Sequence, residues 1–182
     1  MMRSEAAHYA SIVFFGTGPL AQRMKAKRLC SLGLLLFSFG NEGSSDSSIA
    51  NDFLAAHNRY RAKVGTPPLA WSDMLANRAQ QWATTLTERG LFLPQRDSQF
   101  GQNLFEISGG HATPASVVAA WMSEETNYHH ETNSCTARCG HYTQVIWRST
   151  KRVGCGVARN GQREVWVCDY DPPGNFVGEK PY

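Results

Sequence analysis

The sequence predicts an α+β fold in which helices pack against a small antiparallel sheet, and three observations indicate it. Apolar residues recur at helical spacing in three segments between residues 49 and 122. Two later segments, residues 152–158 and 164–170, alternate with a period of two around a turn, which predicts a β-hairpin. Helical and strand patterns do not alternate as β-α-β units, so an antiparallel sheet is expected.

Two helices are predicted in the first half of the domain. The first follows Ser47 or Ser48 as its N-cap and stops at Gly65. Its apolar stripe consists of Ile49, Phe53, Ala56, Tyr60 and Val64. The second follows Ser72 as its N-cap and ends at Gly90, the residue type that most often follows a helix. Its stripe consists of Leu75, Ala79, Trp82 and Leu86.

The remaining elements are shorter. Residues 66–71 are predicted to form a turn and residues 103–107 a short strand. A third helix opens at Thr113-Pro114, because proline is favoured at the first helical position. Its inward residues are expected to be Val117, Val118, Trp121 and Met122. Residues 140–148 are predicted to form a short fourth helix.

The hairpin also bears on the cysteines. If Cys155 faces Cys168, the turn consists of Gly161 and Gln162, and glycine in the first position suits a type II′ turn. The competing turn, Asn160-Gly161, would offset the two cysteines by two residues. A Cys155–Cys168 bridge is therefore compatible with the local geometry.

The N-terminal region predicts export. Residues 24–40 contain a basic run followed by an apolar run that is too short to span a membrane, which is typical of a secretory signal peptide. Residues 1–23 are then an upstream extension, and residues 41–47 form a flexible mature N-terminus. We expect residues 48–182 to be one domain of a protein that is secreted, or periplasmic in a bacterium, without a transmembrane anchor.

Charge and cysteine content narrow the possible functions. Residues 41–182 contain 13 Lys or Arg and 14 Asp or Glu, with no basic block, so nucleic-acid binding is not expected. The same region contains four cysteines, which in an oxidising compartment predict two disulfides with three possible pairings. The four are Cys135, Cys139, Cys155 and Cys168. Disulfide formation leaves little reason to expect a thiolate nucleophile or a cysteine metal site in residues 133–144.

Two polar residues stand out as site candidates. Glu124 follows Trp121 by three positions on the buried stripe of the third helix, where a carboxylate requires a partner. It is either a ligand in a cavity or a structural carboxylate bound to His141 or to backbone amides. His57 is expected to be half-buried, while His111, His129 and His130 are expected on exposed loops.

Five motifs, in order along the chain, resemble the superfamily of cysteine-rich secretory proteins, antigen 5 and plant class 1 pathogenesis-related proteins (CAP). They are AAHNRYRAKVGTPPLAW, FGQNLFEI, VVAAWMSEETNY, CGHYTQVIWRSTKRVGCGV and VCDYDPPGNFVGEKPY. The resemblance covers residues 48–182 and implies an α-β-α sandwich in a secreted protein. It also implies the pairing Cys135–Cys139 and Cys155–Cys168, with the third bridge of the plant proteins lost.

The family has a central cavity in which two histidines and two glutamates can hold a divalent metal. Position by position, the resemblance places Gln95, Gln102, Glu124 and His141 in that cavity. Glutamine thus replaces one histidine and one glutamate, and an amide oxygen is a poor zinc ligand. We expect zinc binding at Glu124 and His141 to be weak or absent, and no cofactor to be required.

The resemblance implies a binding role more than an enzymatic one. Family members bind lipids, fatty acids or sterols, or act on extracellular or host proteins, and residues 127–133 lie where sterol contacts are proposed in relatives. The alternative is a hydrolase that acts outside the cell, metal-dependent or of the Ser/His/Glu type, with Thr143 or Ser134 near His141 as the nucleophile. The sequence has no nucleophile elbow and no HExxH motif, so no catalytic residue is assigned.

Overall fold

The computed structural model describes residues 43–96 and 98–182, with side chains from residue 48 on. The predicted extension and signal peptide, residues 1–40, lie outside the described residues. The elements in chain order are α1 (Gly43–Lys63), β1 (Ala70–Trp71), α2 (Asp73–Glu88), β2 (Gly101–Ser108), α3 (Pro114–Met122), the 3-10 helix η1 (Ser123–Asn127), β3 (Tyr128–His129), β4 (Ser134–Cys135), α4 (Gly140–Val145), β5 (Arg152–Asn160) and β6 (Arg163–Asp171).

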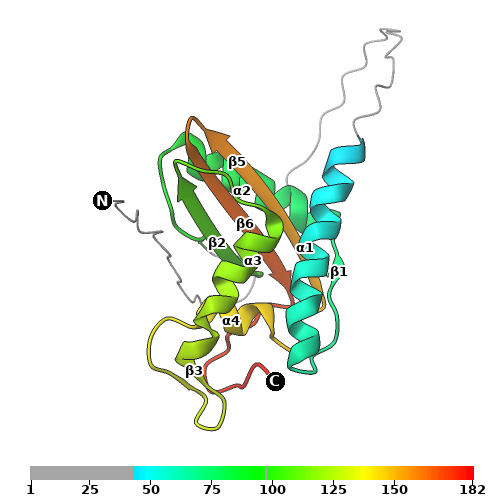
Figure 1. The fold of residues 1–182 in the computed structure, drawn as a ribbon, viewed down its shortest axis with the longest axis vertical. Helices are drawn as coiled ribbons and strands as arrows, with labels where there is room; N and C mark the ends of the chain where they lie inside the picture. Colours follow the sequence, from blue (N-terminus) through cyan, green and yellow to red (C-terminus); the bar gives the residue numbers. More distant parts are fainter. Residues whose placement is uncertain (1–42, 97) are drawn as a thin grey trace, which may run out of the picture.

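The predicted α+β class and the α-β-α arrangement are both confirmed. The main sheet has the strand order β1-β5-β6-β2, and β3 pairs with β4 in a separate ribbon. Figure 1 shows α1 and α3 in front of the sheet and α2 behind it, with α4 below at the end where the chain terminates. None of the helices in the described residues is long and apolar enough to cross a membrane.

Each face of the sheet has its own apolar core. The core between the sheet and α1, α3 and α4 includes Phe53, Val118, Trp121, Tyr142, Ile146 and Trp166. The core beneath α2 includes Ala79, Ala83, Leu86, Leu104, Val165 and Val167. Strand β6 supplies both cores because successive side chains of a strand point to opposite faces.

The β5–β6 hairpin has the predicted register. Cys155 lies opposite Cys168 and Asn160 opposite Arg163, so the turn consists of Gly161 and Gln162. Gly161 has a φ of 58°, which the first position of a type II′ turn requires. Both predicted disulfides are present, Cys155–Cys168 across the hairpin and Cys135–Cys139 between β4 and α4.

Helix caps follow the sequence signals. The Ser72 hydroxyl accepts a hydrogen bond from the Leu75 amide at the start of α2, and Thr113 caps α3 with a capping box. Helix α2 approaches β5 very closely at Gly154. A Cβ atom on Gly154 would lie 2.2 Å from the Ala76 backbone nitrogen, so only glycine allows this packing.

The structure differs from the sequence expectations in several elements: α4 ends at Val145 and not at residue 148, and His129, expected on a loop, lies on β3. Helix α1 begins at Gly43 and includes residues 43–47, which were expected to be flexible, because the apolar stripe does not determine where a helix starts. Residues 70–71, expected within a turn, form strand β1 and pair in parallel with Arg152 and Val153. Two residues are too few to show a strand pattern, and the neighbouring β5 provides the hydrogen bonds.

Candidate functional site

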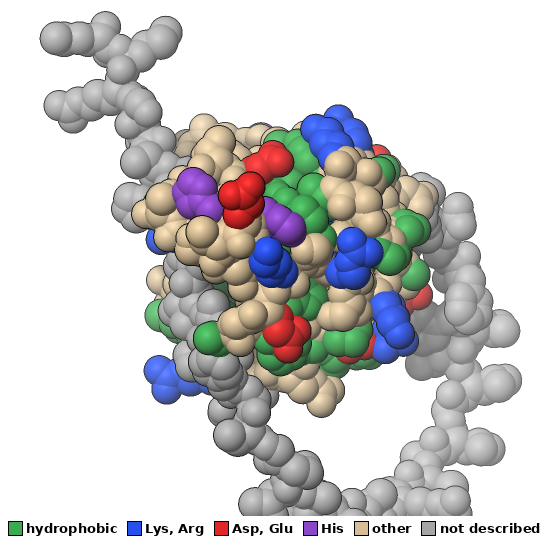
Figure 2. Space-filling view, turned by 90° about the horizontal axis from the view of Figure 1, so that it is seen from below, with side chains coloured by type: hydrophobic (Ala, Val, Ile, Leu, Met, Phe, Trp, Pro, Cys, Tyr) green, Lys and Arg blue, Asp and Glu red, His purple; other side chains and the backbone are tan. Residues whose placement is uncertain are grey.

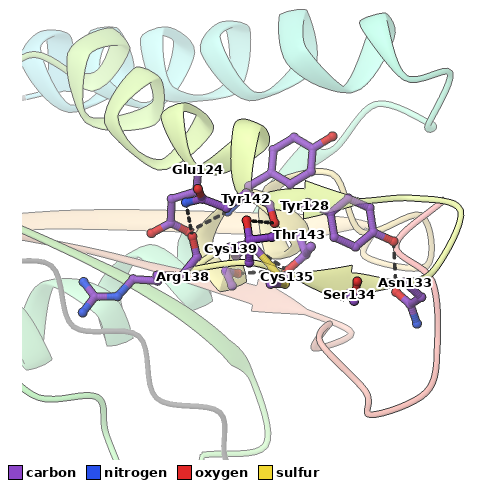
Figure 3. The surroundings of a disulfide bond; sticks show 12 residues. Glu124, Tyr128, Asn133, Ser134, Cys135, Arg138, Cys139, Tyr142 and Thr143 are labelled. Carbon is purple, nitrogen blue, oxygen red and sulfur yellow. Dashed lines mark hydrogen bonds between the residues drawn. A yellow bond between two sulfur atoms is a disulfide. The ribbon is translucent and has the colours of Figure 1, made fainter.

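An apolar hollow lies at the end of the molecule beside α4. A pocket of about 460 Å³ is bounded by residues 128–140 on one side and by residues 175–181 on the other. Its apolar lining consists of Tyr128, Trp147, Phe176, Val177, Pro181 and the Cys135–Cys139 disulfide. The size lies within the range typical of pockets that hold small organic ligands. In Figure 3 the disulfide lies between Glu124 and the pair formed by Tyr128 and Asn133.

Two asparagines hold the walls of this pocket together. The Asn175 side-chain amide donates to the Gly140 carbonyl at 2.9 Å, and its oxygen accepts from the Thr143 hydroxyl at 2.6 Å. The Asn133 oxygen accepts from the Tyr128 hydroxyl at 3.0 Å, and its amide donates to the Glu179 carbonyl at 3.1 Å. Both asparagines have positive φ, which asparagine adopts more readily than most residues.

Glu124 and His141 form one buried pair. Residue Glu124 is 8 % exposed and His141 is 2 % exposed. The His141 ring donates from Nδ1 to Glu124 Oε1 at 2.8 Å, and the His141 backbone amide donates to Oε2 at 2.9 Å. Trp121 stacks on the His141 ring with an interplanar angle of 24°. The carboxylate therefore joins η1 to the start of α4, which is one of the two roles considered from the sequence.

The two glutamines form a second pair, which Gln102 connects to Asp169 on β6. The Gln95 backbone amide donates to Gln102 Oε1 at 2.8 Å, and Gln102 Nε2 donates to Asp169 Oδ1 at 2.7 Å. Asp169 is fully buried, and its second oxygen lies 3.2 Å from Nε of Arg78 in α2. Burial raises the pKa of Asp169 to about 6, although Gln102 and Arg78 act in the opposite direction.

The donor set of the four cavity positions does not suit zinc. Both oxygens of Glu124 already accept hydrogen bonds, and the Gln102 oxygen is held by the Gln95 amide. Within residues 43–96 and 98–182, no three His, Cys, Asp or Glu side chains are grouped so that they could hold a metal ion. The structure thus joins Gln95 to Gln102, and Glu124 to His141. Gln102 lies on β2, whereas Glu124 lies on η1 and His141 on α4.

His57 is fully buried, and not half-buried as expected from the sequence. Its Nδ1 lies 2.8 Å from the Phe53 carbonyl and its Nε2 lies 2.9 Å from the Tyr170 hydroxyl. A carbonyl only accepts, so Nδ1 carries the proton and Nε2 accepts from Tyr170. The Tyr170 hydroxyl also lies 3.3 Å from the Asn103 amide. The helical pattern alone underestimates the burial of His57, because its hydrogen-bond partner Tyr170 lies 113 residues away in the sequence.

The proposed nucleophiles and the other histidines have different surroundings. The Thr143 hydroxyl lies within hydrogen-bonding distance of the Cys139 carbonyl and of Asn175, and Ser134 is exposed on β4 beside Thr132. His129 and His130 are exposed as predicted. The side chain of His111 is also exposed, but its ring donates to the buried carboxylate of Glu164.

Sequence reasoning missed the C-terminal wall of the pocket and the charged pair beside Gln102. The signal for Asp169 was present, because an acidic residue interrupts the apolar run of residues 165–170 in β6. Residues 175–181 show no periodic pattern, so only their position across from β3 and β4 reveals that they line a pocket.

The sequence matches a protein family and a curated relative. The family model described as the cysteine-rich secretory protein family matches residues 54–170. Pathogenesis-related protein 1A of Nicotiana tabacum is 43% identical over 152 residues, covering 82% of this chain and 90% of that protein.

Two solved structures share the fold. Venom allergen-like protein 4 of Schistosoma mansoni superposes with a TM-score of 0.58 and 27% identity, over 77% of this chain and 94% of that one. The crystal structure of NaASP2 with Zn2+ superposes with a TM-score of 0.62 at 21% identity, over 80% and 90% of the two chains.

Proposed function

Because this chain belongs to the cysteine-rich secretory protein (CAP) family, we propose that it is a secreted, non-enzymatic protein that binds a lipid. The ligand is sterol-like or fatty-acid-like, and it occupies the pocket between residues 128–140 and residues 175–181. The observation that carries the proposal is the lining of that pocket. Tyr128, Trp147, Phe176, Val177 and Pro181 provide apolar surface together with the disulfide, and polar groups at the walls can orient a ligand.

The polar groups suit an amphipathic molecule. Asn133, Asn175 and Thr143 present amide and hydroxyl groups beside apolar surface, so a ligand with one hydroxyl or carboxyl group could be oriented there. A disulfide in the wall stabilises the pocket in an oxidising compartment. The predicted signal peptide further supports export. An extracellular protein partner is the alternative occupant of the same surface.

Zinc is not part of the proposed function. NaASP2, a structural neighbour, contains Zn2+, but here two neutral amides stand at the positions carried over from the metal-binding members of the family. Both oxygens of the Glu124 carboxylate already accept hydrogen bonds, from the His141 ring and from its backbone amide. Calorimetric titration with zinc should therefore detect no binding that depends on His141, with His141→Ala as the comparison.

The hydrolase alternative receives no support from the geometry. The Thr143 hydroxyl lies 2.6 Å from Asn175 Oδ1 in the pocket wall, and Ser134 lies on an exposed strand. The pair formed by Glu124 and His141 stabilises the start of α4. This structural role does not depend on a substrate.

A fluorescent sterol and a fluorescent fatty acid, titrated separately, test the binding role. Tyr128→Ala removes an aromatic wall of the pocket and should weaken binding by about tenfold. Trp71→Ala is the matched control, because Trp71 lines a separate hollow of about 650 Å³ between α1 and α2. Mass spectrometry of lipids that co-purify with the unmodified protein would identify the natural ligand. Absence of saturable binding of both probes, or equal losses in the two variants, would refute the proposal.

A further inference from the structure

The mouth of the pocket carries an exposed apolar tip. Phe176 is 45% exposed and Val177 is 77% exposed, and the two are adjacent in the chain. The other exposed large hydrophobic residues among the described residues, Met74 and Leu91, have no such neighbour. Isolated exposed apolar residues are common, whereas adjacent ones beside a pocket are typical of an interaction site.

The tip is held in place from both ends, so its exposure does not result from a loose chain. On one side, Asn175 bonds the start of α4, and Gly174 lies under the Trp147 ring, where a Cβ would come within 2.6 Å of Cγ. On the other side, the Pro181 carbonyl accepts a hydrogen bond from the Arg148 amide at 2.7 Å. The chain turns at residues 177–178 between these two anchors.

The same end of the molecule is more basic than the rest. Residues 128–140, 147–151 and 175–182 together have a net charge of +2, whereas residues 41–182 as a whole have a net charge of −1. The charged residues of the three segments are Arg138, Arg148, Lys151 and Lys180 against Glu131 and Glu179. Figure 2 views this end and shows a band of hydrophobic side chains with Lys and Arg side chains beside it.

We propose that Phe176 and Val177 form a docking tip that inserts into the surface of an anionic lipid bilayer and presents the pocket to it. The inference rests on the proposed function, because a protein that binds a lipid of low water solubility has to take that lipid up from a membrane. Exposed apolar side chains flanked by Lys and Arg are the combination that favours adsorption to anionic membranes. The tip is a single turn at residues 177–178, so the apolar surface that it presents is small.

Vesicle sedimentation tests the tip without any pocket ligand. The full-length mature protein is mixed with phosphatidylcholine vesicles that contain phosphatidylserine, and with vesicles of phosphatidylcholine alone. Phe176→Ser with Val177→Ser should reduce the bound fraction by about tenfold. Met74→Ser is the matched control, because Met74 is 54% exposed but lies on α2 and outside the pocket. It should bind like the unmodified protein, and circular dichroism verifies that both variants are folded.

The outcomes separate the two proposals. Equal sedimentation of the unmodified protein and the double variant, or no sedimentation of either, would overturn the docking tip and favour a protein partner for this surface. Binding of the fluorescent sterol in detergent solution is measured in parallel. If the sterol does not bind but the unmodified protein sediments with the vesicles and the double variant does not, the proposed ligand is wrong and the docking tip is supported.

Discussion

Acidification should destabilise this protein through His57. In the folded state, burial lowers the pKa of His57 from 6.5 to about 4, and the nearby Arg61 acts in the same direction, while the bond to the Phe53 carbonyl opposes the shift. A protonated ring could not accept the hydrogen bond from the Tyr170 hydroxyl, so the present arrangement favours the neutral form of His57.

The sign and size of the effect follow from linkage. Between pH 6.5 and 4 the unfolded chain binds a proton at His57 that the folded protein does not, so stability falls as the pH falls through this window. The full difference corresponds to about 3 kcal/mol, of which about 2 kcal/mol is lost between pH 7 and pH 4.5. This is a large fraction of the stability of a domain of this size.

Urea denaturation of the unmodified protein and of His57→Gln, each at pH 7 and pH 4.5, measures the effect. The variant should be less stable at pH 7, since the hydrogen bonds of the ring are not fully reproduced, but its stability should lack the loss of about 2 kcal/mol on acidification. His129→Gln is the matched control, because His129 is exposed. It should retain the pH dependence of the unmodified protein.

The comparison isolates the effect of His57, because the carboxyl groups whose pKa values are also shifted, Asp169 and Glu164, are present in all three proteins. Asp169, with its pKa raised from 3.8 to about 6, stabilises the fold as the pH falls through that window. Burial alone would raise the pKa of Glu164, but hydrogen bonds from His111, Arg159 and others lower it to about 2, so its contribution is lost only below about pH 4.5. Equal losses of stability in the unmodified protein and in His57→Gln would refute the reasoning.

Three further predictions concern packing, the disulfide and the glutamine pair. Gly154→Ala should lower the unfolding free energy by at least about 3 kcal/mol in thermal or urea melts, because the new methyl group would collide with the α2 backbone. Replacing both Cys155 and Cys168 with alanine should cost about 2 to 3 kcal/mol, also measured by urea unfolding. Gln102→Glu should destabilise the protein at pH 7 and less at pH 5, because it sets a second carboxylate against buried Asp169; the same stability loss at both pH values would contradict this.

The elements with a clear period were predictable from the sequence. The stripe of α2, the capping Ser72, the proline-led α3 and the alternating β5 and β6 are local patterns, and each contains the physical reason for its structure. The hairpin register that allows the Cys155–Cys168 bridge was one of two that the turn residues permitted, and the family resemblance implied that bridge. The burial of Glu124 and His141 was anticipated in the same way, from a carboxylate on an apolar stripe and from the family motif.

The tertiary structure alone decided where the distant partners lie. Gln102 meets Asp169 and His57 meets Tyr170 across 67 and 113 residues of chain, and no local pattern encodes such a contact. The pocket arises the same way, because its two walls come from an irregular loop and an irregular C-terminal segment. Local periodicity determines which face of an element is buried, whereas the pairing of polar groups inside the protein depends on how those faces are brought together.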